Sequence, residues 1–586
     1  FLEHRDELGG PGGPLDGFAN AEVRVIVRPT RSYALLLFES FHPYALGDGL
    51  DRDRLLDRLW LAARETPTLE RVIPAERRDL LRGDIPMFTT RPGTRYIWSS
   101  DGERFPDLQP DSGLERVRRR LERLDEGELT RQAWLVHNSL ATIDLLRGEH
   151  PSYDFREVPP PSRDEILAAA VDIGRRLEEI AFRGPRDAHW FAPDTVGNTW
   201  TLRPAGLDLY VGIPGITLFL AHLGSVTGED RFTGLAREAT VTFRDQIRRI
   251  QMSGIGAYTG WGSVVWTLTH LGALWEDEEL LAEAERVAFE EIPPRIPDDE
   301  CSDLIGGASG CLISLLTLHG VRPSERLLEV AVQCGERLLA RALPMERGLA
   351  WHLAVAGPTP LAGLSHGAAG IAWPLLRLAA LTGDSRFREA ALGGLQYERS
   401  LYRPDKRNWP DLRNGTVPEE APEPHFMWAW CHGAPGIGLG RLAGLPWLDD
   451  AIIREEIGNA VESTFENGFG RNHSLCHGDL GNLELVTLAA EKLNRPDWAE
   501  RAGRIAGGIL AGLRERGPLF GLPGRTEPPG LMTGLAGIGY GLLRLAAPER
   551  VPSVLILEGP DRPWHHLRKP VPECNPHAPS SSPSSS

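Results

Sequence analysis

The sequence predicts a mainly α-helical protein whose C-terminal part is an array of paired helices that can close into an α/α toroid. The main observation is a repeat: seven short glycine-containing turns each open an apolar helix, with copies roughly 45–65 residues apart. Further helical segments, such as residues 325–343, lie between the copies. Because each unit of such an array buries its face against its neighbours, a fixed helix–helix period indicates a helical array. Spacing alone does not distinguish a closed ring from an open superhelix.

The seven turns share a small-residue pattern of the G-x-x-G kind. They read VGIPG (from residue 211), TGWGS (259), IGGASG (305), SHGAAG (365), CHGAPG (431), CHGDLG (476) and TGLAG (533). Glycine permits positive φ and close backbone approach. We therefore expect the turns to gather at one crowded mouth of the array.

A shorter α+β block precedes the array. Residues 23–40 read as a strand that passes into a helix, residues 51–65 as a helix, residues 81–99 as a turn-rich stretch and residues 112–146 as strongly helical. Three prolines, 159–161, then interrupt any helix. Ser162 and Glu165 form a capping box for the next helix.

We therefore place a domain boundary at the proline run. The predicted limits are 1–155 for the first block, 156–162 for a proline-rich linker, 163–557 for the helical array and 558–586 for a disordered tail rich in proline and serine. The chain starts at Phe1 without an initiator Met or a signal peptide. We expect a fragment whose upstream part is missing; natural processing is the alternative.

Composition excludes several classes of protein. The 586 residues carry 64 basic and 81 acidic side chains, a net charge of −17, which argues against a nucleic-acid partner. No stretch approaches the eighteen or so apolar residues of a transmembrane helix, so we do not expect an integral membrane protein. Six cysteines in this length do not make a disulfide framework, and they favour a reducing, cytoplasmic setting.

Three turns carry His or Cys where the others have small or apolar residues. If the turns converge, Cys431, Cys476 and His477 offer two thiolates and one imidazole at one place. Three such ligands with an open fourth position describe a catalytic zinc site. A single C-H-G would more often hold an ordinary buried cysteine, but two copies at one phase of a repeat favour the metal.

The remaining one of these three turns, Ser365-His366-Gly367, supplies the candidate acid/base, His366, whose imidazole titrates near neutral pH. Asp303 precedes the third turn and is placed to orient that imidazole; a helix cap and a core histidine are the alternatives. Trp428 and Trp430 flank Cys431 and are candidates to wall the site, with His432 in the same pocket. A hydrolase that uses paired carboxylates is disfavoured, because the seven turns supply only Asp303 and Asp479.

These motifs, W-C-H-G, a later C-H-G and an upstream S-H-G, resemble those of the LanC-type lanthionine cyclases over roughly residues 163–555. The resemblance implies an α/α toroid with zinc held by Cys431, Cys476 and His477, an acid/base His366, and Asp303 in its pocket. The pattern departs from the family at two positions. Met427 stands where some stand-alone cyclases carry Arg, and His432 stands where a Tyr can occur.

The first block resembles the end of the dehydratase domain of class II lanthipeptide synthetases, the LanM type, through VRVIVRPTRSY (23–33) and GDIPMF (83–88). That resemblance casts Arg24 and Thr30 in the elimination of phosphate from phospho-Ser/Thr; an arginine suits a phosphate clamp. A strand-end Arg and a turn Thr are the alternative. The family's ATP- and Mg²⁺-dependent phosphorylation belongs to upstream residues with no counterpart in these 586 residues.

The resemblance implies that a peptide cysteine adds, with zinc, to dehydroalanine or dehydrobutyrine and forms a thioether ring. We expect the chain to cyclise a dehydrated peptide but not to dehydrate one. Its implied partners are a precursor peptide with a leader segment and a peptide exporter. Two alternatives stay open: a LanC-like protein that binds glutathione or adds thiols to other substrates, and a non-catalytic zinc scaffold that holds a peptide.

Overall fold

We describe the protein from a computed structural model, in which residues 1–64, 66–106, 108–145, 150–196, 199–353, 357, 359–413 and 425–560 are placed well enough to describe. The chain forms two compact units, Phe1–Gln132 and Ala133–Ser586. The division falls inside a helix, α8 (Glu126–Asp144), upstream of the proline run. The domain limits drawn from the sequence stay a prediction, and residues 561–586 of the predicted tail lie outside the described residues.

The first unit is α+β. An antiparallel sheet has the strand order β1-β2-β3-β4, in which Arg24 pairs with Thr89 and Phe88 with Ser99. Its strands are β1 (Val23–Val25), β2 (Phe88–Thr90), β3 (Ile97–Ser99) and β4 (Arg104–Phe105). Its helices are α1 (Arg5–Gly9), η1 (Pro14–Phe18), α2 (Thr30–Ser40), α3 (Pro43–Leu46), α4 (Gly49–Leu56), α5 (Leu59–Ala63), η2 (Pro67–Arg71), α6 (Ile73–Arg82) and α7 (Gly113–Glu122).

The strand and helix predicted over 23–40 are confirmed as β1 and α2. One other expectation needs correction. The helix expected over 51–65 breaks between Leu56 and Leu59, which are both buried in one small core. The helical character expected over 112–146 is confirmed by α7 and α8, and the turn-rich stretch 81–99 also contains strands β2 and β3. Strands of three residues leave too short a pattern to separate from turns.

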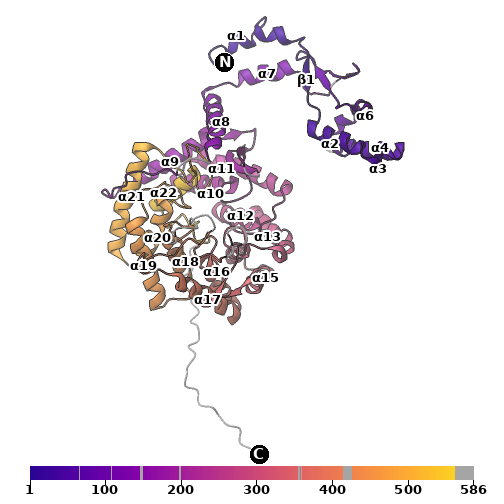
Figure 1. Cartoon of the computed structure of the whole chain (residues 1–586). Coiled ribbons are helices and arrows are strands. Elements are labelled where there is room, and N and C mark those ends of the chain that lie inside the picture. The colour runs from indigo at the N-terminus through magenta and orange to yellow at the C-terminus, as the bar shows by residue number, and fades with distance from the viewer. Residues whose placement is uncertain are drawn as a thin grey trace, which may run out of the picture. The chain divides into compact units, whose positions relative to one another are not determined.

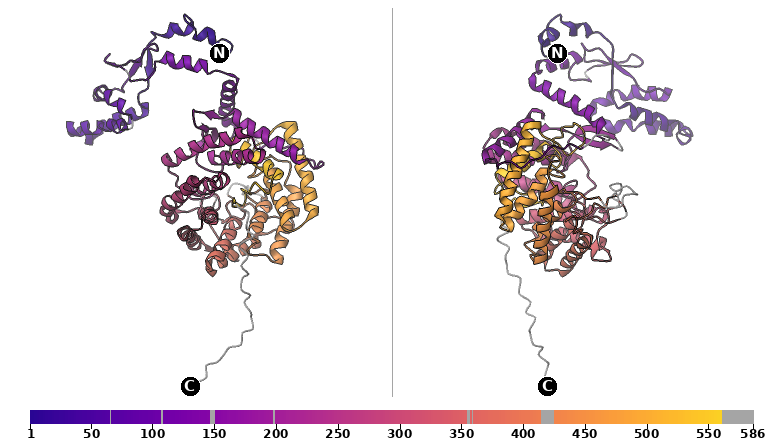
Figure 2. Two further views of the ribbon diagram at one scale, coloured as in Figure 1. Left: turned by 180° about the vertical axis from the view of Figure 1, so that it is seen from behind. Right: turned by 60° about the vertical axis from the view of Figure 1, so that its left-hand side comes forward.

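The second unit is a ring of helix pairs, visible in Figures 1 and 2 as a circle that runs from magenta to yellow. The inner helices are α10 (Ile213–Thr227), α12 (Trp261–Trp275), α14 (Ala308–Val321), α16 (Ala368–Thr382), α18 (Ala434–Gly444), α20 (Asp479–Lys492) and α22 (Leu535–Ala546). The outer helices are α9 (Arg163–Glu179), α11 (Asp230–Arg249), α13 (Glu278–Glu290), α15 (Glu325–Arg341), α17 (Ser385–Leu401), α19 (Ala451–Asn467) and α21 (Pro496–Arg516).

The ring closes where its two ends meet. The last inner helix, α22, packs against the previous inner helix α20, against the first inner helix α10, and against α9, the first outer helix of the ring. The mainly helical toroid is therefore confirmed. The capping box of Ser162 and Glu165 is confirmed as well, at the start of α9. Among the described residues, no helix combines the length and the apolar character needed to cross a bilayer.

Burial distinguishes the two layers of the ring. In α12 every residue from Trp261 to Gly272 is buried, because neighbours surround an inner helix on all sides. In the outer helix α11 the buried residues follow a stripe at helical spacing, such as Phe232, Leu235 and Ala239. The second unit also contains three short antiparallel hairpins. They pair β5 (Phe182–Arg183) with β6 (Ala188–His189), β7 (Phe191–Val196) with β8 (Thr199–Pro204), and β9 (Leu343–Pro344) with β10 (Leu349–Ala350). A short η3 (Pro293–Asp298) follows α13.

Candidate metal centre

A circle of backbone hydrogen bonds joins the glycine turns at one mouth of the ring. Each turn donates an N–H to a carbonyl of the next turn, so that turns distant in sequence lie edge to edge. The bonds are Tyr210 to Tyr258 (3.2 Å), Tyr258 to Ile305 (3.1 Å), Leu304 to Ser365 (3.2 Å), Ser365 to Cys431 (3.4 Å), Cys431 to Cys476 (3.2 Å), Cys476 to Met532 (2.9 Å) and Met532 to Tyr210 (2.9 Å).

The inner helices begin directly after a glycine, and Gly433 shows why this residue is needed. Its φ is +89°, a region that other residues rarely adopt, and a Cβ would lie 1.9 Å from the carbonyl oxygen of Met427. From six of the seven turns, a residue one or two places before this glycine lines the mouth. The cavity there has a volume of about 180 Å³, and it is lined by Tyr210, Thr259, Ile305, Ser365, His366, Trp430, Cys431 and Cys476.

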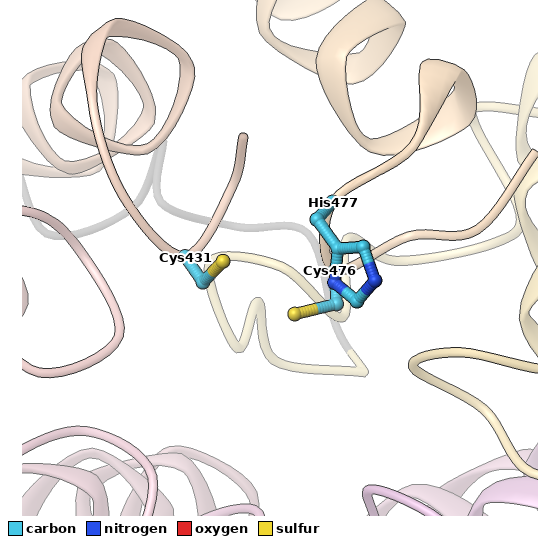
Figure 3. Close-up of side chains that lie close together, drawn as sticks. All are labelled: Cys431, Cys476 and His477. Carbon is cyan, nitrogen blue, oxygen red and sulfur yellow. The ribbon is translucent and has the colours of Figure 1, made fainter. Parts of the chain in front are cut away.

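Three potential metal ligands meet at this cavity. One donor atom from each of Cys431, Cys476 and His477 lies within 4.8 Å of the others, and no fourth His, Cys, Asp or Glu of the described residues joins them. Figure 3 shows Cys431 reaching in from one turn and Cys476 with His477 from the next. Two thiols and one imidazole with an open fourth position fit a catalytic zinc site.

Partners outside the cluster orient its members. Nε2 of His477 lies 2.6 Å from the carbonyl oxygen of Gly521, which leaves Nδ1 for a metal. The Tyr210 hydroxyl donates to Sγ of Cys476 at 2.9 Å. Such outer-sphere hydrogen bonds fix the ligand rings and tune thiolates. The residues of this site thus fit zinc in donor type and in outer-sphere support.

Electrostatics within the cluster favour one thiolate even without a metal. A hydrogen bond from the Cys476 thiol lowers the pKa of Cys431 well below its usual range, although burial opposes the charge, and His477 adds to the effect. The same hydrogen bond and burial raise the pKa of Cys476. The pair therefore holds one proton between two sulfurs, and a metal would replace that proton.

His366 lines the same cavity and is held by Asp303. Its Nδ1 lies 2.6 Å from Oδ2 of Asp303, and this carboxylate is only 2% exposed. The other oxygen, Oδ1, accepts backbone hydrogen bonds from Gly306 and Gly307. Asp303 therefore does two things: it caps its own turn with one oxygen and orients the imidazole with the other. Burial disfavours the charged ring, but Asp303 and the nearby Cys431 outweigh it and raise the pKa of His366. Nε2 is then the nitrogen that can exchange a proton with a substrate.

The aromatic candidates divide. Trp430 is fully buried, lines the cavity, and donates its indole N–H to the carbonyl of Leu555. Trp428 instead donates to Ser463 of α19 and is not among the lining residues. His432 is also absent from the lining; it lies behind the cavity with its ring 5.9 Å from that of His366.

Sequence reasoning missed an ion pair beside the site. Arg413 pairs with the buried Asp411 at 2.7 Å, and its Nη2 lies 3.1 Å from Sδ of Met427. Burial disfavours the guanidinium charge, but Asp411, Cys431 and Cys476 raise the pKa of Arg413. A guanidinium thus reaches the side chain of Met427 from a segment outside the repeat. Tyr210 was also missed, although it stands two residues before its glycine, at the phase of Cys431 and Cys476.

In the first unit the two dehydratase candidates lie together. Arg24 of β1 donates from Nη2 to Oγ1 of Thr30, the first residue of α2, at 3.3 Å, and both side chains are exposed. The pair is therefore accessible to a ligand, and its role in phosphate elimination stays a prediction.

A helical toroid with a Cys₂His donor set at one mouth defines a class, the α/α-toroid proteins with a candidate metal site. Comparison with known proteins narrows this class. A family model described as lanthionine synthetase C-like protein matches residues 203–556, more than half of the chain. The chain belongs to this family. A second model, a domain of unknown function (DUF4135), matches residues 1–91.

Two curated relatives come from Lactococcus lactis subsp. lactis. The lacticin 481/lactococcin biosynthesis protein LcnDR2 is 21% identical over 549 residues, 89% of this chain and 55% of that protein. The nisin biosynthesis protein NisC is 26% identical over 328 residues, 49% of this chain and 75% of that protein. The chain thus spans about half the length of LcnDR2. Among solved structures, nisin cyclase is 18% identical with a TM-score of 0.48, covering 67% of this chain and 96% of that chain.

Proposed function

We propose that the toroid is a zinc-dependent lanthionine cyclase domain, within a protein of the class II (LanM) type. It joins a peptide cysteine to dehydroalanine or dehydrobutyrine and forms a thioether ring. The observation that carries the proposal is that His366, held by Asp303, shares one cavity of about 180 Å³ with Cys431 and Cys476, which cluster with His477. The names of both curated relatives, biosynthesis proteins for lacticin 481/lactococcin and for nisin, support a substrate of that kind.

The donor set determines what zinc would contribute. Held by Cys431, Cys476 and His477, zinc would act as a Lewis acid that lowers the pKa of a substrate thiol at the open position. The chain's own residues do the rest. The mouth orients the peptide between Trp430 and Tyr210, and the acid/base His366 exchanges a proton at Nε2 while Asp303 holds Nδ1.

The bond changes balance without a further reactant. The sulfur of the substrate cysteine bonds to the β-carbon of the alkene, the C=C pair moves to the α-carbon as an enolate, and one proton reaches that carbon. The proton lost by the thiol equals the proton gained by the product. Either transfer is within the reach of a histidine with a raised pKa.

The experiment uses the chain with zinc and a short peptide that holds one cysteine and one dehydroalanine. Ring closure leaves the mass unchanged, so the readout is the loss of a thiol that can be alkylated. We expect protection from alkylation with about one zinc per chain. Zinc-loaded protein that leaves the peptide thiol reactive would contradict the proposal. Addition of free glutathione in place of ring closure would instead favour a thiol-adding protein.

A second activity, dehydration of Ser and Thr in the substrate, would depend on the first unit. We propose that Arg24 and Thr30 take part in phosphate elimination there, in a protein that phosphorylates Ser/Thr with ATP and Mg²⁺. The accessible hydrogen bond between the two side chains supports this role. Precursor-leader recognition, a cytoplasmic location and association with a peptide exporter are parts of the same proposal.

A further inference from the structure

Residues 150–161, which we call the strap, lie along α21 without forming a helix or a strand. Glycines on α21 make room for them. A Cβ at Gly507 would lie 2.5 Å from the carbonyl oxygen of Pro159, and one at Gly508 would lie 2.3 Å from that of Arg156. Distances this short exclude a side chain at either position, so the helix presents a bare backbone groove to the strap. The strap is therefore a packed part of the second unit.

Polar contacts fix the strap along this groove. The Val158 N–H donates to the carbonyl of Arg504 at 3.2 Å. Glu157 accepts hydrogen bonds from Arg501 at 2.9 Å and from Arg504 at 3.2 Å. These contacts hold the middle of the strap in one register on α21.

Tyr153 carries the strap from α21 to the loop that precedes α20. Its ring lies 5.0 Å from the ring of His473, and a Cβ at Gly512 would lie 2.6 Å from it. Its N–H donates to the carbonyl of Gly470 at 3.0 Å, and its hydroxyl donates to Oδ2 of Asp479 at 2.6 Å. A partly buried hydroxyl and a buried carboxylate that satisfy each other form a strong, directional contact.

Asp479 closes the loop on itself. It is fully buried, it is the first residue of α20, and its carboxylate also accepts the N–H groups of Gly470 and Arg471 at 3.0 and 3.3 Å. The loop between these residues contains both Cys476 and His477. The Tyr153 hydroxyl therefore holds the carboxylate that shapes the loop of two candidate metal ligands.

We propose that the strap positions the candidate metal centre, with Tyr153 acting as a positioning residue through Asp479. At the end of the strap the ring of His150 lies 5.8 Å from the ring of His477, in an edge-to-face arrangement. The segment that enters the toroid thus contacts the metal-ligand loop at two points. Nothing in this role requires Tyr153 to touch a substrate.

The test is Tyr153→Phe in the full chain, read by titration of the metal-free protein with Co²⁺ and by the visible spectrum of the bound ion. Phenylalanine keeps the packing on Gly512 and His473 and removes the hydrogen bond to Asp479. We expect about tenfold weaker Co²⁺ affinity, the lower end for outer-sphere partners, together with an altered spectrum. Tyr540→Phe is the matched control, because the buried Tyr540 also donates one hydrogen bond, to the carbonyl of Pro552 at 2.8 Å.

The inference rests on the proposed metal centre, and the measurement separates the two. Wild-type protein that takes up no Co²⁺ contradicts the metal centre itself. Wild-type affinity and spectrum in Tyr153→Phe overturn the strap proposal alone, as does an equal loss in Tyr540→Phe. Gly512→Ala gives an independent check if Tyr153→Phe folds poorly, since its Cβ displaces the Tyr153 ring without changing the loop. The same loss of affinity supports the proposal, and unchanged affinity overturns it.

Discussion

Three turns of the ring place a histidine at the same position, directly before the glycine, and each imidazole has a different environment. His477 has one nitrogen on a backbone carbonyl, at 2.6 Å from Gly521. His366 has one nitrogen on a carboxylate, at 2.6 Å from Asp303. Nδ1 of His432 is buried without a hydrogen-bond partner among the described residues and lies 4.0 Å from Asp411. One backbone frame therefore supports three environments for the same side chain.

The partner of each ring explains the difference. A carbonyl fixes the ring of His477. Burial disfavours its charge, but Cys431 and the Gly521 carbonyl outweigh burial and raise its pKa, and a metal that replaced this proton would find a lone-pair donor. A carboxylate favours the imidazolium and raises the pKa of His366, which suits a proton carrier. Burial lowers the pKa of His432 and so favours its neutral form. The position in the repeat places each histidine directly before its glycine, and the groups around each ring determine its chemical role.

The largest expected effect is at the cysteine turns. Cys431→Ala and Cys476→Ala each remove one of three protein ligands, so we expect zinc content to fall from about one per chain to near zero and ring formation to be lost. Zinc content and the alkylation assay measure both effects. Cys311→Ala is the matched control, because Cys311 is a fully buried cysteine remote from the cluster in sequence and absent from it. Zinc retained in either cluster variant would contradict the assignment of Cys431 and Cys476 as ligands of one metal site.

The next largest effect separates the two histidine roles. His366→Asn should leave zinc content unchanged and lower the rate of ring formation about 10²–10⁴-fold, the usual contribution of a general acid or base. His477→Asn should lose zinc as well as rate. Zinc content against rate therefore distinguishes the proton carrier from the ligand, and a similar zinc loss in both variants would contradict the assignment.

The sequence predicts the ligand set because residues at equivalent positions of the repeat come close together in the ring. Cys431, Cys476 and His366 stand at defined places before their glycines, and the ring brings these places together. Tyr210 stands at the same phase, but a tyrosine before a turn carries no chemical signal by itself. Arg413 could not be predicted, since it lies between α17 and α18, outside the repeat, and reaches Met427 through tertiary packing. The backbone of the ring can thus be predicted from the sequence, whereas side-chain contacts from segments outside the repeat cannot.

The same limit applied to the first unit. Strand β1 and helix α2 were predicted because the alternation of residues 23–28 changes to helical spacing. Strands β2 and β3 are three residues each, with Pro92 and Gly93 between them, so their turn signal masks them. The break between α4 and α5 has no glycine or proline at Asp57 or Arg58 to announce it.

A smaller effect tests the carboxylate. Asp303→Asn removes the charge that raises the pKa of His366, so that pKa falls. Whichever limb of the pH–rate profile His366 produces should therefore move to lower pH, with a rate loss at the optimum smaller than in His366→Asn. Rates from pH 5 to 9 at constant zinc give the measurement. A profile that keeps its limbs in Asp303→Asn would mean that another group titrates in the reaction.

The smallest effect is expected at the third histidine. His432→Leu removes a buried ring whose Nδ1 lacks a hydrogen bond, so neither zinc content nor the position of either pH limb should change. We expect ring formation to stay within a few-fold of wild type, because the substitution removes neither a ligand nor a proton carrier. The same assays apply. A loss as large as that of His366→Asn would show that His432, which lies between His366 and the Asp411–Arg413 pair, passes a proton or a charge to the cavity. The carboxylate would then no longer suffice to explain which imidazole of the three is the acid/base, and the assignment would extend to the pair behind it.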